Sequence, residues 1–168
     1  MKTLSCSSIY FILCILFVFN SAHAAPMGME VHGTTCVIQN PGNTINASAP
    51  ANTAVFYNGL GLDLTEKANT QNWIHCPVPI TGPLHQARFI MAEYYKSVAT
   101  SKINTIKIYN GPVLVATAIP PAGVVGWNVF SVDLGSFRDF IGGMDVSLNI
   151  APLANTRFII STLSVLYQ

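Results

Sequence analysis

Residues Ile103–Ile119 read INTIKIYNGPVLVATAI, two apolar runs joined at Asn110-Gly111. An Asn-Gly pair favours a two-residue hairpin turn, because both central residues take a positive φ, which Asn tolerates and Gly adopts freely. The pattern therefore predicts a β-hairpin. Pro112 would be the first residue of its return strand, one of the few strand positions that accepts a residue without an N–H.

A two-residue loop at Asn110-Gly111 also fixes which residues face each other. It predicts that Ile108 pairs with Val113 and that Ile106 pairs with Val115, so that one face of the hairpin is wholly aliphatic. The opposite face would carry a mixture of side chains, namely Thr105, Lys107, Tyr109, Leu114 and Ala116. Such a division is typical of an antiparallel sheet with one face on a core and the other toward water.

The rest of the chain repeats this pattern in short apolar segments that Pro-, Gly- or Asn-rich segments separate. The expected strands are residues 31–38, 53–57, 60–64, 71–76, 126–134, 144–150 and 157–167. The clearest alternation predicts four inward side chains, Met144, Val146, Leu148 and Ile150. Strands at this spacing predict an all-β protein, an antiparallel β-sandwich of jelly-roll type whose last strand pairs near the first.

Two segments are less regular. Leu84–Lys96 has apolar side chains at helical spacing, but turn signals on both sides favour a strand, and both interpretations stay open at this point. Gly135–Gly143 is predicted to be a loop or one short turn of helix.

The first residues are typical of an export signal. Lys2 precedes an unbroken apolar run over 9–19, and Ala22-His23-Ala24 gives the small-x-small pattern of a cleavage site. The apolar run is too short for a typical membrane span. We therefore expect residues 1–24 to be a signal peptide and residues 25–168 to be a single domain that is secreted or periplasmic, with no membrane contact after cleavage.

The amino-acid composition restricts the classes of binding partner that are expected. Charged residues make up 9% of the chain, against about 25% in a typical soluble domain. Without Lys2, the seven remaining basic and seven acidic side chains balance. Because there is no run of basic residues, neither nucleic acid nor an anionic membrane surface is expected as a partner.

Cys36 and Cys76 are the two cysteines outside the expected signal peptide. In an oxidising compartment one such pair predicts a disulfide, and two buried free thiols are the alternative. Two sulfurs without Cys-x-x-Cys spacing do not predict a zinc site. Asp133, Asp139 and Asp145 are interpreted as outward strand and loop residues rather than as a cation site. No metal or cofactor is predicted.

The chain from Cys36 to Pro79 resembles a group of small secreted bacterial proteins of uncharacterised function. The matching residues are Cys36, Tyr57-Asn58-Gly59-Leu60-Gly61 and Cys76-Pro77-Val78-Pro79. In that group, a strand ends in Cys-Pro-Val-Pro or Cys-Pro-Leu-Pro. The resemblance implies a secreted, jelly-roll-like β-sandwich with a Cys36–Cys76 bridge. It implies no catalytic residues.

The sequence contains no G-x-S-x-G elbow, no H-E-x-x-H motif, no phosphate-binding Gly loop and no EF-hand. The histidines outside the expected signal peptide, His32, His75 and His85, are isolated in the sequence. We therefore predict that the protein is not an enzyme. A small hydrolase, the least favoured alternative, would need His75 or His85 near a carboxylate in a cleft.

Aromatic side chains give the functional hypothesis. By alternation, Trp73, Tyr109 and Trp127 lie opposite the core faces of their strands, and His75 shares the face of Trp73. Aromatic rings stack on the C–H groups of sugars, and amides bind their hydroxyls. These four residues are the predicted ligand-binding set of a secreted, non-catalytic, carbohydrate-binding-like module.

Two alternatives remain. In the first, a loop or helix covers these aromatic side chains, so that they are part of the core. In the other, the protein is a structural or interaction component of the cell surface or matrix that pairs with another surface protein or with itself.

Overall fold

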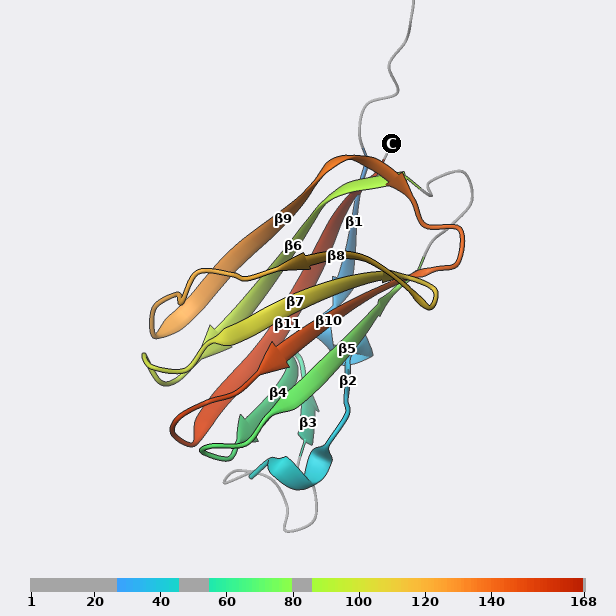
Figure 1. Ribbon diagram of the computed structural model, residues 1–168. Coiled ribbons are helices and arrows are strands. Elements are labelled where there is room, and N and C mark those ends of the chain that lie inside the picture. The colour runs from blue at the N-terminus through green and yellow to red at the C-terminus, as the bar shows by residue number, and fades with distance from the viewer. Residues whose placement is uncertain (1–26, 46–54, 80–85, 168) are drawn as a thin grey trace, which may run out of the picture.

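The computed structural model describes residues 27–45, 55–79 and 86–167, and in these ranges the strands form two antiparallel sheets (Figure 1). Sheet A contains, in spatial order, β3 (Val55–Asn58), β4 (Gly61–Glu66), β11 (Thr156–Tyr167), β6 (Gln86–Lys96) and β9 (Gly126–Asp139), with β1 (Met27–His32) also paired to β11. Sheet B contains β2 (Val37–Ile38), β5 (Asn72–Val78), β10 (Met144–Ile150), β7 (Ile103–Asn110) and β8 (Val113–Ala118). Two 3-10 turns, η1 (Gly33–Thr35) and η2 (Pro41–Asn43), flank β2. The expected signal peptide lies outside the described residues.

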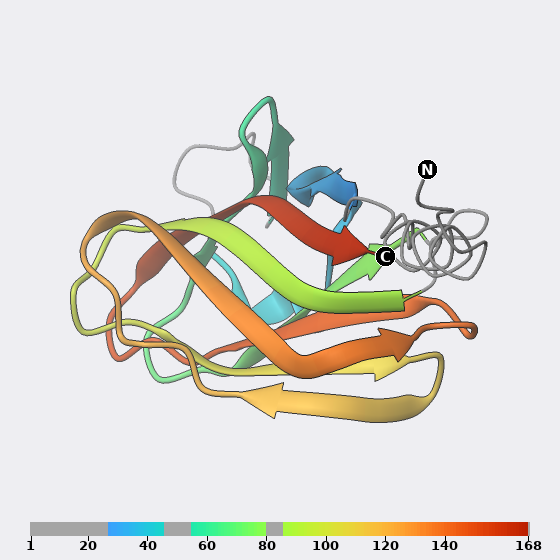
Figure 2. The ribbon, with the colours of Figure 1, turned by 90° about the horizontal axis from the view of Figure 1, so that it is seen from above.

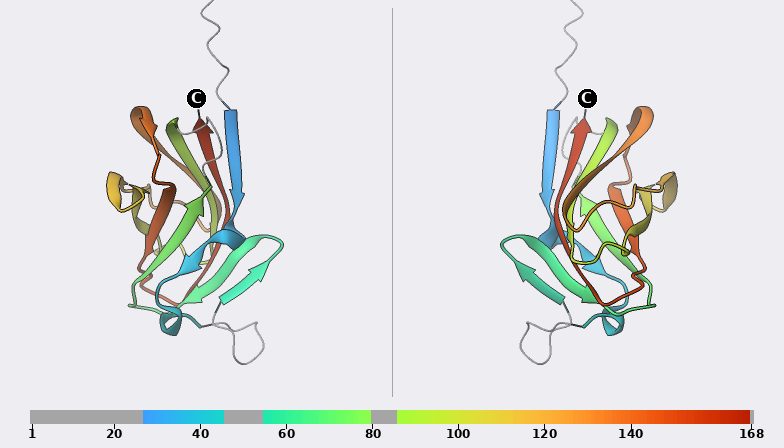
Figure 3. Two further views of the ribbon diagram at one scale, coloured as in Figure 1. Left: turned by 90° about the vertical axis from the view of Figure 1, so that its right-hand side faces the viewer. Right: turned by 90° about the vertical axis from the view of Figure 1, so that its left-hand side faces the viewer.

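The connectivity is that of a jelly roll. The strand order β4-β11-β6-β9 in sheet A faces the order β5-β10-β7-β8 in sheet B, and the chain crosses between the sheets after most strands (Figures 2 and 3). The long strand β11 is internal, because it has β6 on one edge and β4 and β1 in succession on the other. The prediction of an all-β jelly-roll sandwich is confirmed, including the pairing of the last strand with the first.

The core lies between the sheets and is aliphatic. Ile106, Ile108, Val146 and Leu148 are completely buried, as the alternation predicted. Ser147 and Asn149 point to the outer face but are also buried, and their side chains form hydrogen bonds with those of His75 and Gln71, respectively. Burial of this apolar surface is the main stabilising contribution in such a domain.

The β7–β8 hairpin forms, but its predicted register is wrong. The turn residues are Gly111 and Pro112, Asn110 pairs with Val113, and a bulge follows the Tyr109–Leu114 pair. Asn110 stays in the strand because its side chain binds the β9–β10 loop: its amide donates to the carbonyl of Asp139 and its Oδ1 accepts from the N–H of Gly142. These contacts are tertiary, so the local Asn-Gly signal could not reveal them. Val113, predicted to face the core, is 61% exposed.

The predicted first strand, residues 31–38, is also wrong, because η1 divides it between the two sheets. The chain crosses from sheet A to sheet B at Gly33, where it passes directly against the backbone carbonyl of Ile160. A side chain at Gly33 would collide with that carbonyl, so glycine allows this crossing.

Several predicted boundaries change. Residues 86–96 are a strand, which confirms the favoured interpretation of Leu84–Lys96 over the range described. Gly135–Gly143 is not simply a loop or helical turn, because β9 continues to Asp139 and pairs there with Gln86. β3 and β4 form a hairpin in which Asn58 pairs with Gly61, so its turn residues are Gly59 and Leu60. β5 includes Pro77, since only one edge of the strand is paired at that position.

No helix in the described ranges has the length and hydropathy that crossing a bilayer requires.

Glu66, at the end of β4, is a fully buried carboxylate whose hydrogen-bond donors are neutral side chains. It accepts hydrogen bonds from the Thr70 hydroxyl at 2.8 Å and the Asn72 amide at 3.2 Å. Burial raises the pKa of Glu66, and these hydrogen bonds offset the rise only in part. A raised pKa means that the contribution of Glu66 to stability is complete below its unfolded-state pKa and is lost as the pH rises through its folded-state pKa.

We therefore expect Glu66→Gln to be more stable than the parent at pH 7, by on the order of 1 kcal/mol, because the amide removes the buried charge. The advantage should shrink as the pH falls toward 4. Urea unfolding of both proteins between pH 4 and 7 measures this difference. An advantage that does not vary with pH would contradict the assigned cause.

Candidate functional site on the outer face of sheet B

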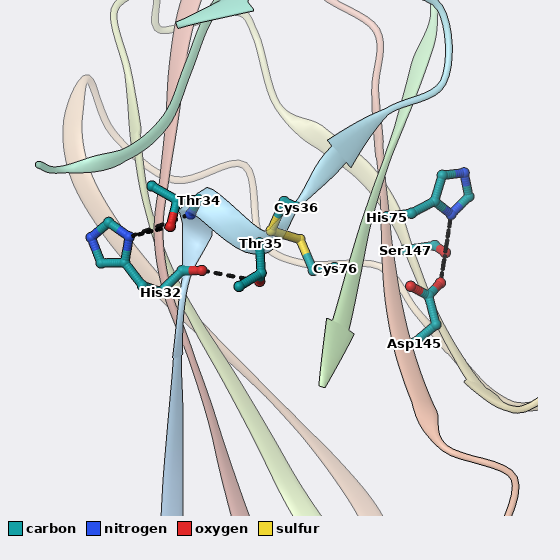
Figure 4. Close-up of a disulfide and its surroundings, with 8 residues drawn as sticks. All are labelled: His32, Thr34, Thr35, Cys36, His75, Cys76, Asp145 and Ser147. Carbon is teal, nitrogen blue, oxygen red and sulfur yellow. Dashed lines mark hydrogen bonds and ion pairs between the residues drawn. A yellow bond between two sulfur atoms is a disulfide. The ribbon is translucent and has the colours of Figure 1, made fainter. Parts of the chain in front are cut away.

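The predicted disulfide is confirmed: Cys36 and Cys76 are bonded, and both are fully buried. Cys36 follows η1 directly, and Cys76 lies in β5 (Figure 4). The bond therefore fixes the crossing between the two sheets to the strand that carries Trp73 and His75.

Three of the four predicted ligand residues share one face. Trp73 and His75 project from β5 and Tyr109 from β7, all on the outer face of sheet B. β10 lies between these two strands and brings polar residues into the same rows. Its pairing sets Asn149 beside Trp73, Ser147 beside His75, and Asp145 beside Tyr109.

A short chain of hydrogen bonds crosses this face. Nδ1 of His75 lies 2.8 Å from Oγ of Ser147, the Ser147 hydroxyl donates to Oδ2 of Asp145 at 2.5 Å, and the His75–Asp145 distance is 3.5 Å (Figure 4). Since the serine gives its one proton to Asp145, His75 must donate from Nδ1 to the serine oxygen. A catalytic serine needs the reverse direction, in which the histidine accepts the hydroxyl proton. The arrangement instead holds an imidazole and a carboxylate on the surface, both partly exposed.

The indole of Trp73 is held from the side of β7. Nζ of Lys107 lies 5.0 Å from the centre of its ring, a cation–π contact. Beside it, the Gln71 amide donates to Oδ1 of Asn149 at 3.0 Å. These contacts fix an aromatic ring next to amide and hydroxyl groups without burying it, and Trp73 remains partly exposed.

A depression of about 1010 Å³ borders the same face at one end of sheet B. Its lining is mainly apolar and includes Pro77, Pro79, Ile141, Met144 and Asp145. Asp145 thus connects the hydrogen-bonded face to a hollow of ligand size.

Trp127 lies apart from the other three. It projects from β9 on the outer face of sheet A, where it is 45% exposed and makes an edge-to-face contact with Tyr95 at 5.7 Å between ring centres. A depression of about 320 Å³ lies next to Trp127 on sheet A. Its lining includes Glu30, Met91, Glu93, Val129, Thr162 and Ser164. The sandwich therefore divides the predicted ligand set between two surfaces.

The same face also carries four residues that the sequence pattern did not single out: Lys107, Asp145, Ser147 and Asn149. The alternation in 144–150 gave the signal that the last three point outward. Nothing in the sequence indicated that β10 lies between β5 and β7.

The other polar candidates have separate partners. Asp133 pairs with Arg88 and Asp139 accepts from Gln86, so these two do not join Asp145 around a common point. The Asp133–Arg88 pair lowers the pKa of Asp133. Within the described ranges no three His, Cys, Asp or Glu side chains are grouped as metal ligands. His32 bonds to Thr34, and His85 lies outside the described residues.

No protein-family model matches the chain, and no curated protein matches it. Solved structures with a similar chain path include three carbohydrate-binding modules. The C-terminal family 6 module of LamC, a laminarinase from Zobellia galactanivorans, is 11% identical over 83% of this chain and 99% of that chain, with a TM-score of 0.47. A family 35 module from Clostridium thermocellum is 12% identical over 83% and 97%, with a TM-score of 0.49. A family 36 domain of a xylanase from the hindgut metagenome of Trinervitermes trinervoides is 9% identical over 83% and 96%, with a TM-score of 0.49.

Proposed function

We propose that the protein is a secreted or periplasmic, non-catalytic binding module that takes a carbohydrate on the outer face of sheet B. The observation that carries the proposal is the grouping of Trp73, His75 and Tyr109 on one partly exposed face, with the Asp145 carboxylate between β5 and β7.

The chemistry of this face suits a neutral, hydroxyl-rich ligand. A sugar ring offers C–H groups that stack on an indole, and hydroxyls that exchange hydrogen bonds with imidazole, carboxylate and amide groups. Lys107 and Asp145 balance each other in charge on this face, so it has no strong attraction for an ionic ligand. The buried disulfide supports an oxidising compartment.

Trp73→Ala is expected to weaken glycan binding at least tenfold, because it removes the stacking surface. Trp127→Ala is the matched control, since it makes the same change on the outer face of sheet A and should bind as the parent does. A glycan array identifies the ligand, and titration calorimetry then compares the three proteins.

Two outcomes count against the proposal. If the parent binds nothing on the array, carbohydrate binding is wrong. If Trp127→Ala loses binding while Trp73→Ala retains it, the ligand face is on sheet A instead.

A further inference from the structure

One long segment of the chain is uncharged. Residues 108–132 contain no Asp, Glu, Lys, Arg or His, and they form the end of β7, all of β8, the β8–β9 connection and the first half of β9. Of the thirteen large apolar side chains exposed in the described ranges, seven lie in this segment: Val113, Leu114, Ile119, Val124, Val125, Trp127 and Val129. Those in β8 and β9 belong to the strands that end sheet B and sheet A respectively, and apolar side chains exposed at such a place mark an interaction surface.

β8 is the edge of sheet B on this side. In the described ranges it pairs only with β7, and Figure 2 shows it as the outermost strand of its layer. None of its residues is fully buried, and Val113 and Leu114 are 61% and 48% exposed. An edge strand turns every second N–H and C=O away from its neighbour, where another strand can bind them.

Natural edge strands are usually protected by a charged side chain or a proline within the strand. β8 reads VLVATA and has neither, and the nearest prolines, Pro112 and Pro120, lie outside it. The bulge near its start is its one irregularity. The rest of the edge is therefore open to pairing.

We propose that the partner of this edge is a second copy of the same chain, whose β8 pairs with it in antiparallel fashion about a two-fold axis. In a two-fold contact a residue of one copy faces a different residue of the other, and only side chains near the axis face their own copies, so a charge near the axis would meet a like charge. The uncharged segment avoids this repulsion altogether. It also offers nothing to a charged partner, whose recognition requires opposite charges.

The pairing has a consequence for the ligand face, which rests on the function proposed above. A two-fold axis perpendicular to the sheet leaves both outer faces of sheet B on the same side of the joined sheet. The Tyr109–Leu114 row would then approach its copy across the junction. Two ligand faces side by side would bind a chain with repeated sugar units more tightly than one face alone.

Sedimentation velocity over a range of concentrations tests the pairing with the purified protein. A contact of one strand per copy is small, so we expect a weak dimer with a Kd on the order of 10 μM. Leu114→Lys should raise the Kd at least tenfold, since it places a charged ammonium group from each copy at an otherwise uncharged strand edge. Leu153→Lys makes the same change at an exposed position in the β10–β11 loop and should leave the Kd unchanged.

Val113→Lys is the second variant at the edge, and melting curves show whether each variant folds. It decides the question if Leu114→Lys fails to fold. A parent that stays monomeric at every concentration overturns the pairing, as does a dimer that folded edge variants retain. Neither result depends on whether the protein binds a sugar.

Discussion

Replacing Lys96 by methionine is expected to lower the free energy of unfolding by about 3–5 kcal/mol. Lys96 is the last residue of β6 and is fully buried. Its ammonium group donates three hydrogen bonds to backbone carbonyls, at 3.1 Å to Ala99, 2.6 Å to Ser101 and 2.6 Å to Ala122. Methionine has a similar length but no donor, so all three carbonyls would lose their bond to the ammonium.

The three carbonyls belong to two different connections. Ala99 and Ser101 lie between β6 and β7, and Ala122 lies between β8 and β9. Lys96 therefore joins the ends of both sheets at one point. Burial lowers the pKa of Lys96, which reflects the cost of removing the ammonium from water, and the three hydrogen bonds offset this cost.

Urea unfolding of Lys96→Met against the parent measures the loss. Lys102→Met is the matched control, because Lys102 is exposed in the same β6–β7 connection, and its replacement should change the stability by less than about 0.5 kcal/mol. Equal stabilities for the two variants would show that the ammonium does not hold these connections together.

Removing the disulfide is the other change with a large expected effect. In the chain-entropy description, Cys36→Ala with Cys76→Ala should cost about 4 kcal/mol, because the bond closes a loop between residues 40 apart in the sequence. For a domain of this size the melting temperature should fall by on the order of 10 °C. The local effect should be greatest at η1, where the chain passes between the sheets.

Calorimetry with and without a strong reductant checks this effect. The double variant should melt at the same temperature under both conditions, whereas the parent should approach the variant once its bond is reduced. Both cysteines are fully buried, so reduction should require partial unfolding and proceed slowly. A parent that melts with the double variant in the absence of reductant would mean that the bond adds nothing to stability.

The alternation of apolar residues was sufficient to predict the core-facing sides of β7 and β10, though not of β8. Ile106, Ile108 and the four inward residues of β10 face the core because burial in a strand follows a period of two, which is a local property. The turns were predicted less well. Asn110 remains in β7 because its side chain binds the β9–β10 loop, and Gly33 interrupts the first strand because it passes against Ile160.

The sequence by itself determined the β-rich character, the disulfide pair and the outward direction of Trp73, His75, Tyr109 and Trp127. Alternation assigns each side chain to a face of its own strand, but it does not say which strands are neighbours. Only the tertiary structure decided that β10 lies between β5 and β7, which brings Asp145 and Ser147 to the aromatic face, and that β9 joins the opposite sheet with Trp127. The reason is that strand order depends on hydrogen bonds between segments far apart in the chain, and these leave no local pattern.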